Sequence, residues 1–283
     1  CGLLGAIIKY PVSSLEMDGE SLDVKKRKLG YFYGERQLYR QICQATGTDG
    51  NRNPLAFILE AADDIAYLTA DLEDSFKKGF VSYDNLVREL ERSWERVGRT
   101  GVDGLGMLRR QYENAKKRQA QDPQLYAVQN WIVRLQRELI LDVTDSFIAR
   151  YEEIMAGTCQ TDLFAGTKSQ WLVEVLGEIA CRYAFHSPHI LKMEVSAWTI
   201  LNFLMDKFVP AALYYDTEIP MDMMGGKLMS LISENYKQTY HVYSSGCAEK
   251  ERLYLRLLLI TDFISGMTDS YAKDLYQKLN GIS

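Results

Sequence analysis

The sequence contains little of several residue types that mark particular classes of protein. Among its 283 residues are 6 prolines, 20 glycines and 5 scattered cysteines, and no C-x-x-C pair occurs. Scarce proline and modest glycine favour long helices, because both residues weaken helix interiors. An odd number of scattered cysteines suits the reduced thiols of the cytoplasm rather than a disulfide framework or a zinc site. We therefore expect a cytoplasmic protein built from helices.

Several familiar site motifs are also missing. The three histidines form neither an H-E-x-x-H motif nor a His-Asp pair, and neither a G-x-x-x-x-G-K-[ST] nor a G-x-G-x-x-G phosphate loop occurs. We interpret His186 and His189, which lie at the turn around Pro188, as structural, and we interpret the isolated His241 in the same way. A net charge of −5 argues against a generally basic surface for nucleic acid.

Long hydrophobic runs are absent as well. The chain opens on the apolar run CGLLGAII, which stops before Lys9 and has too few residues to span a bilayer. No basic segment precedes the run, as a secretory signal would require. We expect no membrane partner, and we interpret the run as the end of a helix that begins upstream in a longer protein.

The most informative side chains lie on a long helical segment in the first third of the chain. Pro54 suits a first helical turn, and no glycine or further proline follows before Gly79. Because a helix turns about 100° per residue, Asp63, Tyr67 and Asp71 fall on one stripe. We expect the buried face of this helix to consist of Leu55, Ile58, Leu59, Ala62, Ile65 and Ala66.

The stripe carries two carboxylates and one phenol. A carboxylate is a hard oxygen ligand for Mg²⁺ or Mn²⁺, and a phenol can stack on a ligand or hydrogen-bond to it. A second carboxylate, two turns on, can accept hydrogen bonds from hydroxyl groups. The plainer interpretation is a solvated acidic face, since charged residues mostly lie outside. Spacing alone leaves both interpretations open.

Helical periodicity continues through the rest of the chain. Apolar residues recur at three and four positions between 124 and 156, and Gly157 stands where that helix would end. In the last segment, Thr268 or Asp269 is expected to cap a new helix after a break at Gly266. Further helices are expected at 35–45, 83–94, 107–120, 166–184, 190–208, 221–236 and 247–280. No strand pattern competes, so the predicted fold class is all-α, a compact multi-helix bundle with no significant sheet.

Four separated segments resemble, in the right order, segments of the bacterial deoxyguanosinetriphosphate triphosphohydrolases (dGTPases) of the HD superfamily. The run PLAFILEAADDIAYLTADLED is similar to the family pattern H-P-L-A-x-L-x-E-A-A-D-D-I-x-Y-x-x-x-D-L-E-D, with Asn53 where the family often has His. The run ITDFISGMTDSYA is similar to D-Y-I-A-G-M-T-D-R-Y-A, with Ser270 in place of the commoner Arg. The segments around Lys9 and Glu35 resemble L-x-A-x-x-K-Y-P and K-x-G-x-F-x-S-E, and each is a weak match by itself.

The resemblance implies roles for four residues, and a fifth, Arg256, is expected to take part from its place about two turns before the break at Gly266. Asp63 matches the aspartate that completes a metal set of two His and two Asp, and Tyr67 and Asp71 match the pair that contacts the deoxyribose and its 3′-hydroxyl. Lys9 resembles a lysine that reaches the substrate phosphates, and Arg256 is expected to face the ligand pocket or a neighbouring subunit. Plainer interpretations stay open for both cations. Lys9 would be a helix-terminal lysine favoured by the helix dipole, and Arg256 a member of an interhelical ion pair.

The resemblance also implies how the chain is divided. Residues 1–80 would be the C-terminal part of an HD-type catalytic core, and residues 81–283 a helical C-terminal region packed on it as one continuous unit. The remaining metal ligands, a His and a His-Asp pair, would lie upstream of Cys1. We therefore expect this chain alone to bind metal poorly and to hydrolyse nothing.

By resemblance, the longer protein would cleave dGTP, or several dNTPs, with water to the deoxynucleoside and tripolyphosphate, using Mg²⁺ or Mn²⁺. Expected partners are further copies of the chain, from dimer to hexamer, a nucleotide effector at a second site, and single-stranded DNA. Two alternatives remain. One is a catalytically dead or regulatory helical interaction module of the same family, and the other is an HD phosphodiesterase acting on a cyclic or signalling nucleotide. The spacing of Asp63, Tyr67 and Asp71 favours the dGTPase over the phosphodiesterase.

Overall fold

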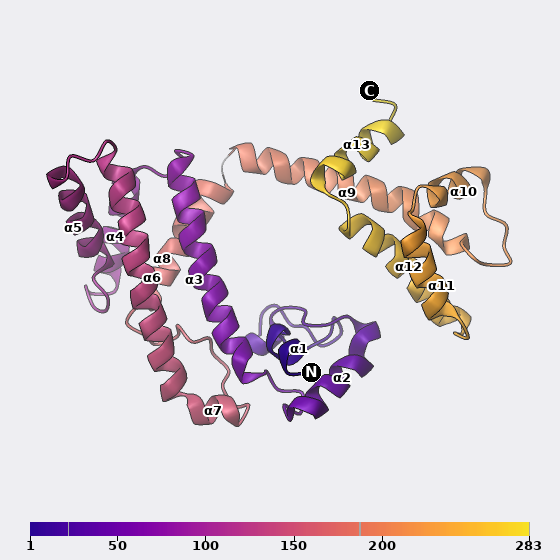
Figure 1. The fold of residues 1–283 in the computed structure, drawn as a ribbon, viewed down its shortest axis with the longest axis horizontal. Coiled ribbons are helices and arrows are strands. Elements are labelled where there is room, and N and C mark those ends of the chain that lie inside the picture. Colours follow the sequence, from indigo (N-terminus) through magenta and orange to yellow (C-terminus); the bar gives the residue numbers. More distant parts are fainter. Residues whose placement is uncertain (22, 187, 283) are drawn as a thin grey trace. The chain divides into compact units, whose positions relative to one another are not determined.

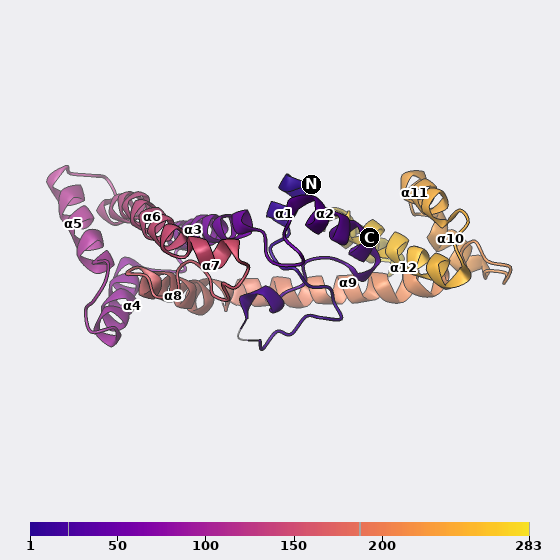
Figure 2. The same ribbon diagram turned by 90° about the horizontal axis from the view of Figure 1, so that it is seen from below.

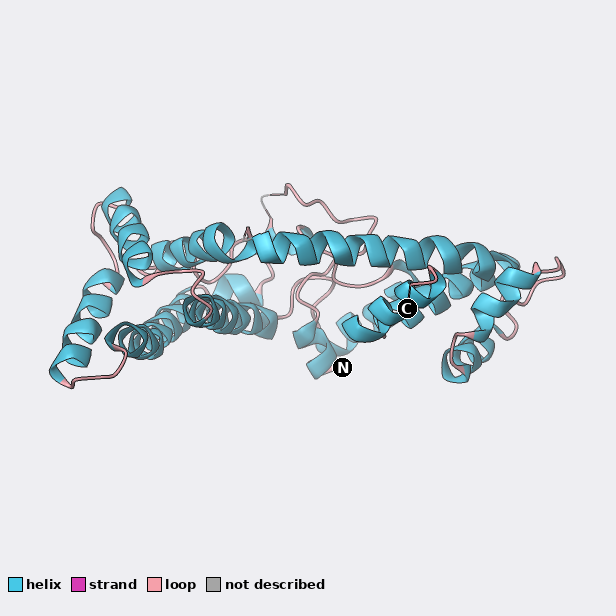
Figure 3. Ribbon diagram, turned by 90° about the horizontal axis from the view of Figure 1, so that it is seen from above, coloured by secondary structure: helices cyan, strands magenta, loops and turns pink. Residues whose placement is uncertain are grey.

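The computed structural model describes residues 1–21, 23–186 and 188–282. In this described part every regular element is a helix, as Figure 3 shows, and the one strand-like contact is an isolated parallel bridge between Ser13 and Tyr31. The predicted all-α class is confirmed. The chain divides into two compact units, Cys1–Ser187 and Pro188–Ser283. The predicted division at residue 80 concerns a catalytic core and its C-terminal region, and it stays a prediction.

The first unit contains eight α-helices among its described residues (Figure 1). Local sequence signals start the two longest of them. The side chain of Asn53 accepts a hydrogen bond from the backbone N–H of Leu55, and Asp122 accepts from Gln124 and Leu125, with a proline next in sequence in both cases. The helices are α1 Gly2–Ile7, α2 Arg36–Thr46, α3 Pro54–Lys77, α4 Tyr83–Arg96, α5 Gly104–Lys117, α6 Pro123–Ala149, α7 Tyr151–Met155 and α8 Gln170–Ile179.

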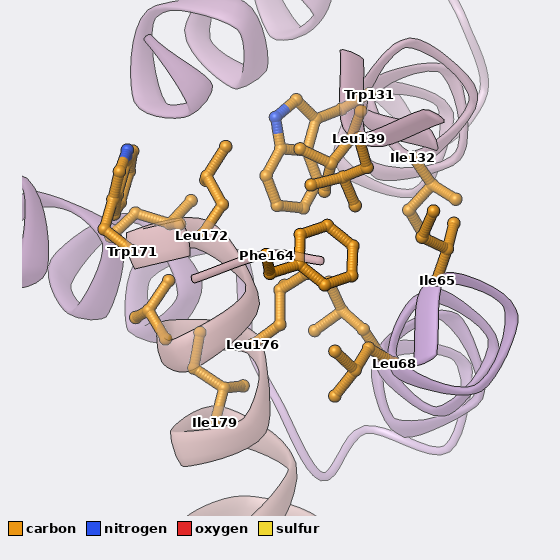
Figure 4. Packing of buried hydrophobic residues seen from close by; sticks show 14 of the residues in the cluster. Ile65, Leu68, Trp131, Ile132, Leu139, Phe164, Trp171, Leu172, Leu176 and Ile179 are labelled. Atoms are coloured by element: carbon orange, nitrogen blue, oxygen red, sulfur yellow. The ribbon is translucent and has the colours of Figure 1, made fainter. Parts of the chain in front are cut away.

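The core of the first unit lies between α3, α6 and α8. Phe164 lies at its centre, with Trp131 of α6, Leu176 of α8 and Leu68 of α3 around the ring (Figure 4). Trp131 is fully buried, and its indole N–H donates to the carbonyl of Gly104 at 2.8 Å. This bond satisfies the one polar atom of the largest buried side chain, so its apolar surface is buried without leaving an unpaired donor. The core therefore fixes α3, which carries the predicted site residues, as one continuous helix.

The predicted buried face of α3 is wrong except at Ile65. Leu55 is 57% exposed, Ile58 and Leu59 are also exposed, and so are the two alanines of the predicted set, Ala62 and Ala66. The first half of α3 carries apolar residues around most of its circumference, so periodicity alone permits more than one buried face. The face of α3 that packs against α6 and α8 is a different one, and its buried residues are Phe57, Ala61, Ile65, Leu68 and Leu72.

The helix predicted over 124–156 is interrupted. It ends at Ala149, and the short helix α7 follows Arg150. The guanidinium of Arg150 donates to the hydroxyl of Thr161 at 2.9 Å and to the carbonyls of Asp162 and Ala165. Its side chain thus fastens the loop after α7 to the end of α6. Gly157 follows α7 with a φ of +72°, which confirms the predicted glycine at this helix end.

The second unit contains five helices in its described part: α9 Pro188–Tyr214, α10 Met223–Ser230, α11 Glu234–Ser244, α12 Glu249–Ser265 and α13 Asp269–Leu279. Leu204 and Phe208 of α9 and Ile260 and Phe263 of α12 form the centre of its core. The hydroxyl of Thr268 accepts from the N–H of Tyr271 at 3.2 Å, which confirms the predicted cap of the last helix. The single helix predicted over 221–236 is instead α10 and the start of α11.

Candidate functional site

The candidate site begins with the exposed side of α3. Asp63, Tyr67 and Asp71 lie on this one unbroken helix, so the spacing read from the sequence is the spacing in the structure. The side chain of Asp63 is 63% exposed and Tyr67 is 47% exposed, while Asp71 is half-buried. An exposed face of two carboxylates and a phenol is therefore available to a ligand.

Lys9 lies directly against Asp63. Its Nζ donates to Asp63 Oδ2 at 2.5 Å, and the lysine side chain is 25% exposed. Lys9 follows the end of α1, which packs on α3, so the fold brings together two predicted site residues that are 54 positions apart. The positive charge of Lys9 thus balances the negative charge of Asp63, the carboxylate that is expected to bind a metal.

A second cluster, which the sequence did not reveal, fixes the segment that carries Lys9. Glu60, one turn before Asp63 and Asp64, accepts from Tyr10 Oη at 2.9 Å and from Arg52 Nη2 at 2.5 Å. Arg52 is 2% exposed, and its guanidinium lies 4.5 Å from the ring centre of Phe57 and 5.6 Å from that of Tyr10. Burial and the neighbouring Glu60 carboxylate raise the pKa of Tyr10 to about 12.

Asp64 differs sharply from its neighbour in sequence. It is half-buried, and burial, followed by the charge of Glu60, raises its pKa to about 6 against the opposing effect of Lys9. Asp162, on the loop that Arg150 fastens, adds to the increase. Asp63 and Asp64 thus differ in burial, as expected for residues about 100° apart on a helix, while the charge of Lys9 acts on both.

Tyr67 and Asp71 lie further along α3 in less crowded surroundings. Burial and the nearby charges of Asp71 and Asp64 raise the pKa of the Tyr67 phenol. Burial and Asp74 raise the pKa of Asp71, which Lys78 opposes. The Tyr67 phenol therefore keeps its proton at neutral pH and can donate a hydrogen bond, which a bare carboxylate cannot do.

Arg256 lies in the second unit, on α12, and its surroundings differ from those of the other predicted residues. It is 2% exposed, and its Nη2 donates to Glu249 Oε1 at 2.5 Å on the same helix. This ion pair lies along one helix, whereas the plainer interpretation expected a pair between helices. The predicted role of Arg256 in substrate binding stays a prediction.

The described residues do not form a metal centre by themselves. No group of three or more His, Cys, Asp or Glu side chains that could hold an ion occurs among them. Asp63 is a suitable oxygen ligand, but its carboxylate is paired with Lys9 and a single exposed carboxylate binds a divalent ion weakly. Within the described part of the chain, Asp63 is therefore not one of a complete set of metal ligands.

The histidines have local partners where the structure describes them. His186 Nδ1 lies 2.6 Å from the carbonyl of Cys181, and His241 Nε2 lies 3.2 Å from Tyr215 Oη. The side chain of His189 is outside the described residues. Within the described part of the chain, no helix combines the length and the apolar character needed to cross a bilayer.

No protein-family model matches the chain. The chain is 40% identical over 285 residues to a deoxyguanosinetriphosphate triphosphohydrolase-like protein of Listeria monocytogenes, an alignment that covers 99% of this chain and 59% of the relative. A protein of the same description from Synechocystis sp. is 25% identical over 298 residues, covering all of this chain and 60% of the relative. A deoxyguanosinetriphosphate triphosphohydrolase of Yersinia enterocolitica is 25% identical over 300 residues, covering 98% of this chain and 59% of the relative.

The chain thus spans about three-fifths of the length of the curated relatives that it matches. The names of these relatives agree with the family that the segments around Asp63 and Thr268 resemble. These similarities support the dGTPase family for this chain.

Proposed function

We propose that the protein to which this chain belongs hydrolyses dGTP, or several dNTPs, to the deoxynucleoside and tripolyphosphate. One observation carries the proposal: Lys9 contacts Asp63 at the head of an exposed stripe that continues through Tyr67 to Asp71. The 40% identity to a deoxyguanosinetriphosphate triphosphohydrolase-like protein supports this interpretation over a solvated acidic face.

The spacing of the stripe suits a nucleotide. An α-helix rises about 1.5 Å per residue, so Asp63, Tyr67 and Asp71 follow one another at about 6 Å along the axis. Phosphates at Asp63 and a sugar at Tyr67 and Asp71 would fit within this span. The half-exposed ring of Tyr67 offers a flat surface for the sugar, and the Asp71 carboxylate accepts a hydrogen bond from the 3′-hydroxyl.

A divalent cation, Mg²⁺ or Mn²⁺, belongs to the proposal. Asp63 would supply one ligand, and residues outside this chain would supply the others. When bound, such an ion polarises a phosphate oxygen and lowers the pKa of a bound water. With an ion at Asp63 to balance the carboxylate, the Lys9 ammonium would be available to the substrate phosphates. The chain alone is expected to bind metal poorly and to be inactive.

The test is dGTP hydrolysis with Mg²⁺ or Mn²⁺, followed by the release of tripolyphosphate, on this chain and on a protein of the relatives' full length. Activity in the longer protein alone supports the proposal. Activity in neither protein, across all four dNTPs, would favour the regulatory module instead. Assembly into oligomers, a nucleotide effector, single-stranded DNA binding and a cytoplasmic location also stay predictions.

A further inference from the structure

Helices α5 and α6 border a cavity whose charged residues the proposed function does not use. The two helices pack along each other, and Figure 2 shows the loop that joins them at one end of the first unit. The cavity has a volume of about 400 Å³, which is within the range of small-molecule sites. Three of the side chains that line it are arginines: Arg110 of α5, and Arg134 and Arg137 of α6. Guanidinium groups gathered at a cavity suit an anion.

The two arginines of α6 lie on a side of the helix that does not face α3. Gln136, which lies between them in sequence, donates to the hydroxyl of Thr69 on α3 at 2.8 Å. At about 100° per residue, Arg134 lies about 160° around α6 from Gln136, and Arg137 lies about 100° from it. The cavity is therefore on a different side of α6 from the contact with α3, and the inference drawn from it does not depend on the proposed hydrolysis.

The charges at the cavity are largely unpaired. Neither Arg134 nor Arg137 forms an ion pair with any residue that the structure describes, and Glu138, one turn after Arg134, forms none either. Arg110 Nη1 lies 3.5 Å from Asp103 Oδ2, and both of these side chains are exposed, so this pair is weak. The guanidinium donors therefore remain available to a ligand.

A buried glutamine supplies the second observation. Gln111 of α5 lines the cavity although it is only 7% exposed, and within the described part of the chain its side-chain amide has no hydrogen-bond partner. The amide is not sealed in the interior, so a molecule in the cavity can reach it. A side-chain amide that is more than nine-tenths buried normally has a partner. The missing partner of Gln111 thus points to a ligand between α5 and α6.

We propose that this cavity binds a small oxyanion that carries two or more anionic groups, either phosphates or carboxylates. Arg134 and Arg137 each offer paired N–H donors to one such group, and the Gln111 amide donates to a further oxygen. A ligand with a single anionic group would leave one of the two arginines unpaired. The acids at the cavity, Asp103 and Glu138, offset only part of the positive charge, and Asp103 already caps α5.

Isothermal titration calorimetry of the 283-residue chain with inorganic pyrophosphate and with citrate, at about 0.15 M salt, tests the proposal. Binding of either anion supports it, and the tighter one shows whether phosphates or carboxylates are preferred. Arg137→Gln should weaken binding by about 10-fold or more, because a charge-assisted hydrogen bond is lost. Arg109→Gln is the matched control. Arg109 is also on α5, but it pairs with Glu91 of α4 at 3.1 Å, so its loss should change the affinity by no more than about 2-fold.

Gln111→Met distinguishes a ligand contact from a general attraction to positive charge. The variant removes the amide and keeps a side chain of similar length, and it should weaken binding by about 5-fold through the loss of one hydrogen bond. Circular dichroism confirms that each variant keeps its helices. Absence of binding by both anions, an affinity that survives Arg137→Gln or Gln111→Met, or equal weakening by Arg109→Gln and Arg137→Gln would each overturn the proposal.

Discussion

Removal of the Glu60 carboxylate should destabilise the first unit far more than removal of an exposed acid. Arg52 is 2% exposed, and among the described residues its guanidinium donates a hydrogen bond to Glu60 alone, while its Nε and Nη1 are buried and find no hydrogen-bond partner there. Glu60→Ala therefore leaves an uncompensated charge in the interior, which costs about 3–5 kcal/mol. It also leaves Tyr10 Oη without its acceptor.

The partner variant should behave differently. Arg52→Met replaces the buried cation by an apolar chain of similar volume between the rings of Phe57 and Tyr10. The expected cost is smaller than that of Glu60→Ala, because the Glu60 side chain that remains is 16% exposed and keeps the hydrogen bond from Tyr10 Oη. This asymmetry between Glu60→Ala and Arg52→Met is expected for a pair in which the cation is the more deeply buried partner.

Urea unfolding followed by tryptophan fluorescence measures both changes. Three of the four tryptophans lie in the first unit, so Trp198→Phe gives a background in which fluorescence reports that unit alone. Glu91→Ala is the control, because the Glu91–Arg109 pair is exposed on both sides and its loss should cost no more than about 1 kcal/mol. If Glu60→Ala lowers the free energy of unfolding by no more than Glu91→Ala does, another group compensates the Arg52 charge and the reasoning is refuted.

Further predictions concern the site and the core. In a protein of the relatives' full length, Asp63→Ala should abolish dGTP turnover and keep the fold, and retained turnover contradicts its assigned role. In the same protein Tyr67→Ala should weaken dGTP binding more than metal binding, and equal losses contradict its assigned role. Because folding raises the pKa of Asp64 from 3.8 to about 6, the folded state binds more protons in that range, and unfolding free energy should fall as pH rises through it. Asp64→Asn should remove this pH dependence and raise the free energy of unfolding at neutral pH by about 1 kcal/mol, a value reduced for solvent screening. Urea unfolding curves at several pH values measure both effects. On α6, Leu135→Ala should lower the free energy of unfolding by about 2–5 kcal/mol, because Leu135 is fully buried. Ile140→Ala, at an exposed position of the same helix, should lower it by under about 1 kcal/mol in the same urea assay. Similar losses for the two variants would contradict the observed burial.

Local rules predicted most of the helices. Proline positions, capping residues and apolar spacing act within a few residues, and they placed α3, the cap at Thr268 and the glycine after α7. The i, i+4 spacing also placed Asp63, Tyr67 and Asp71 correctly on one stripe, because a continuous helix converts sequence spacing directly into position.

Longer-range contacts were beyond such rules. The buried face of α3 depends on which neighbouring helix packs against it, and more than one face is apolar in sequence, so the prediction selected the wrong residues except at Ile65. The cluster of Tyr10, Arg52 and Glu60 joins three segments, and no local pattern distinguishes a buried arginine from an exposed one. The one sequence signal for this cluster is Glu60 itself, an acidic residue at the edge of an otherwise apolar helical turn.

Release of tripolyphosphate from dGTP tests the central claim most directly. It should be measured with Mg²⁺ or Mn²⁺ on this chain, on a protein of the relatives' full length and on the Asp63→Ala variant of that longer protein. The account predicts product from the unmodified longer protein alone. Product from this chain by itself, or from the Asp63→Ala variant, would contradict the placement of the site on α3.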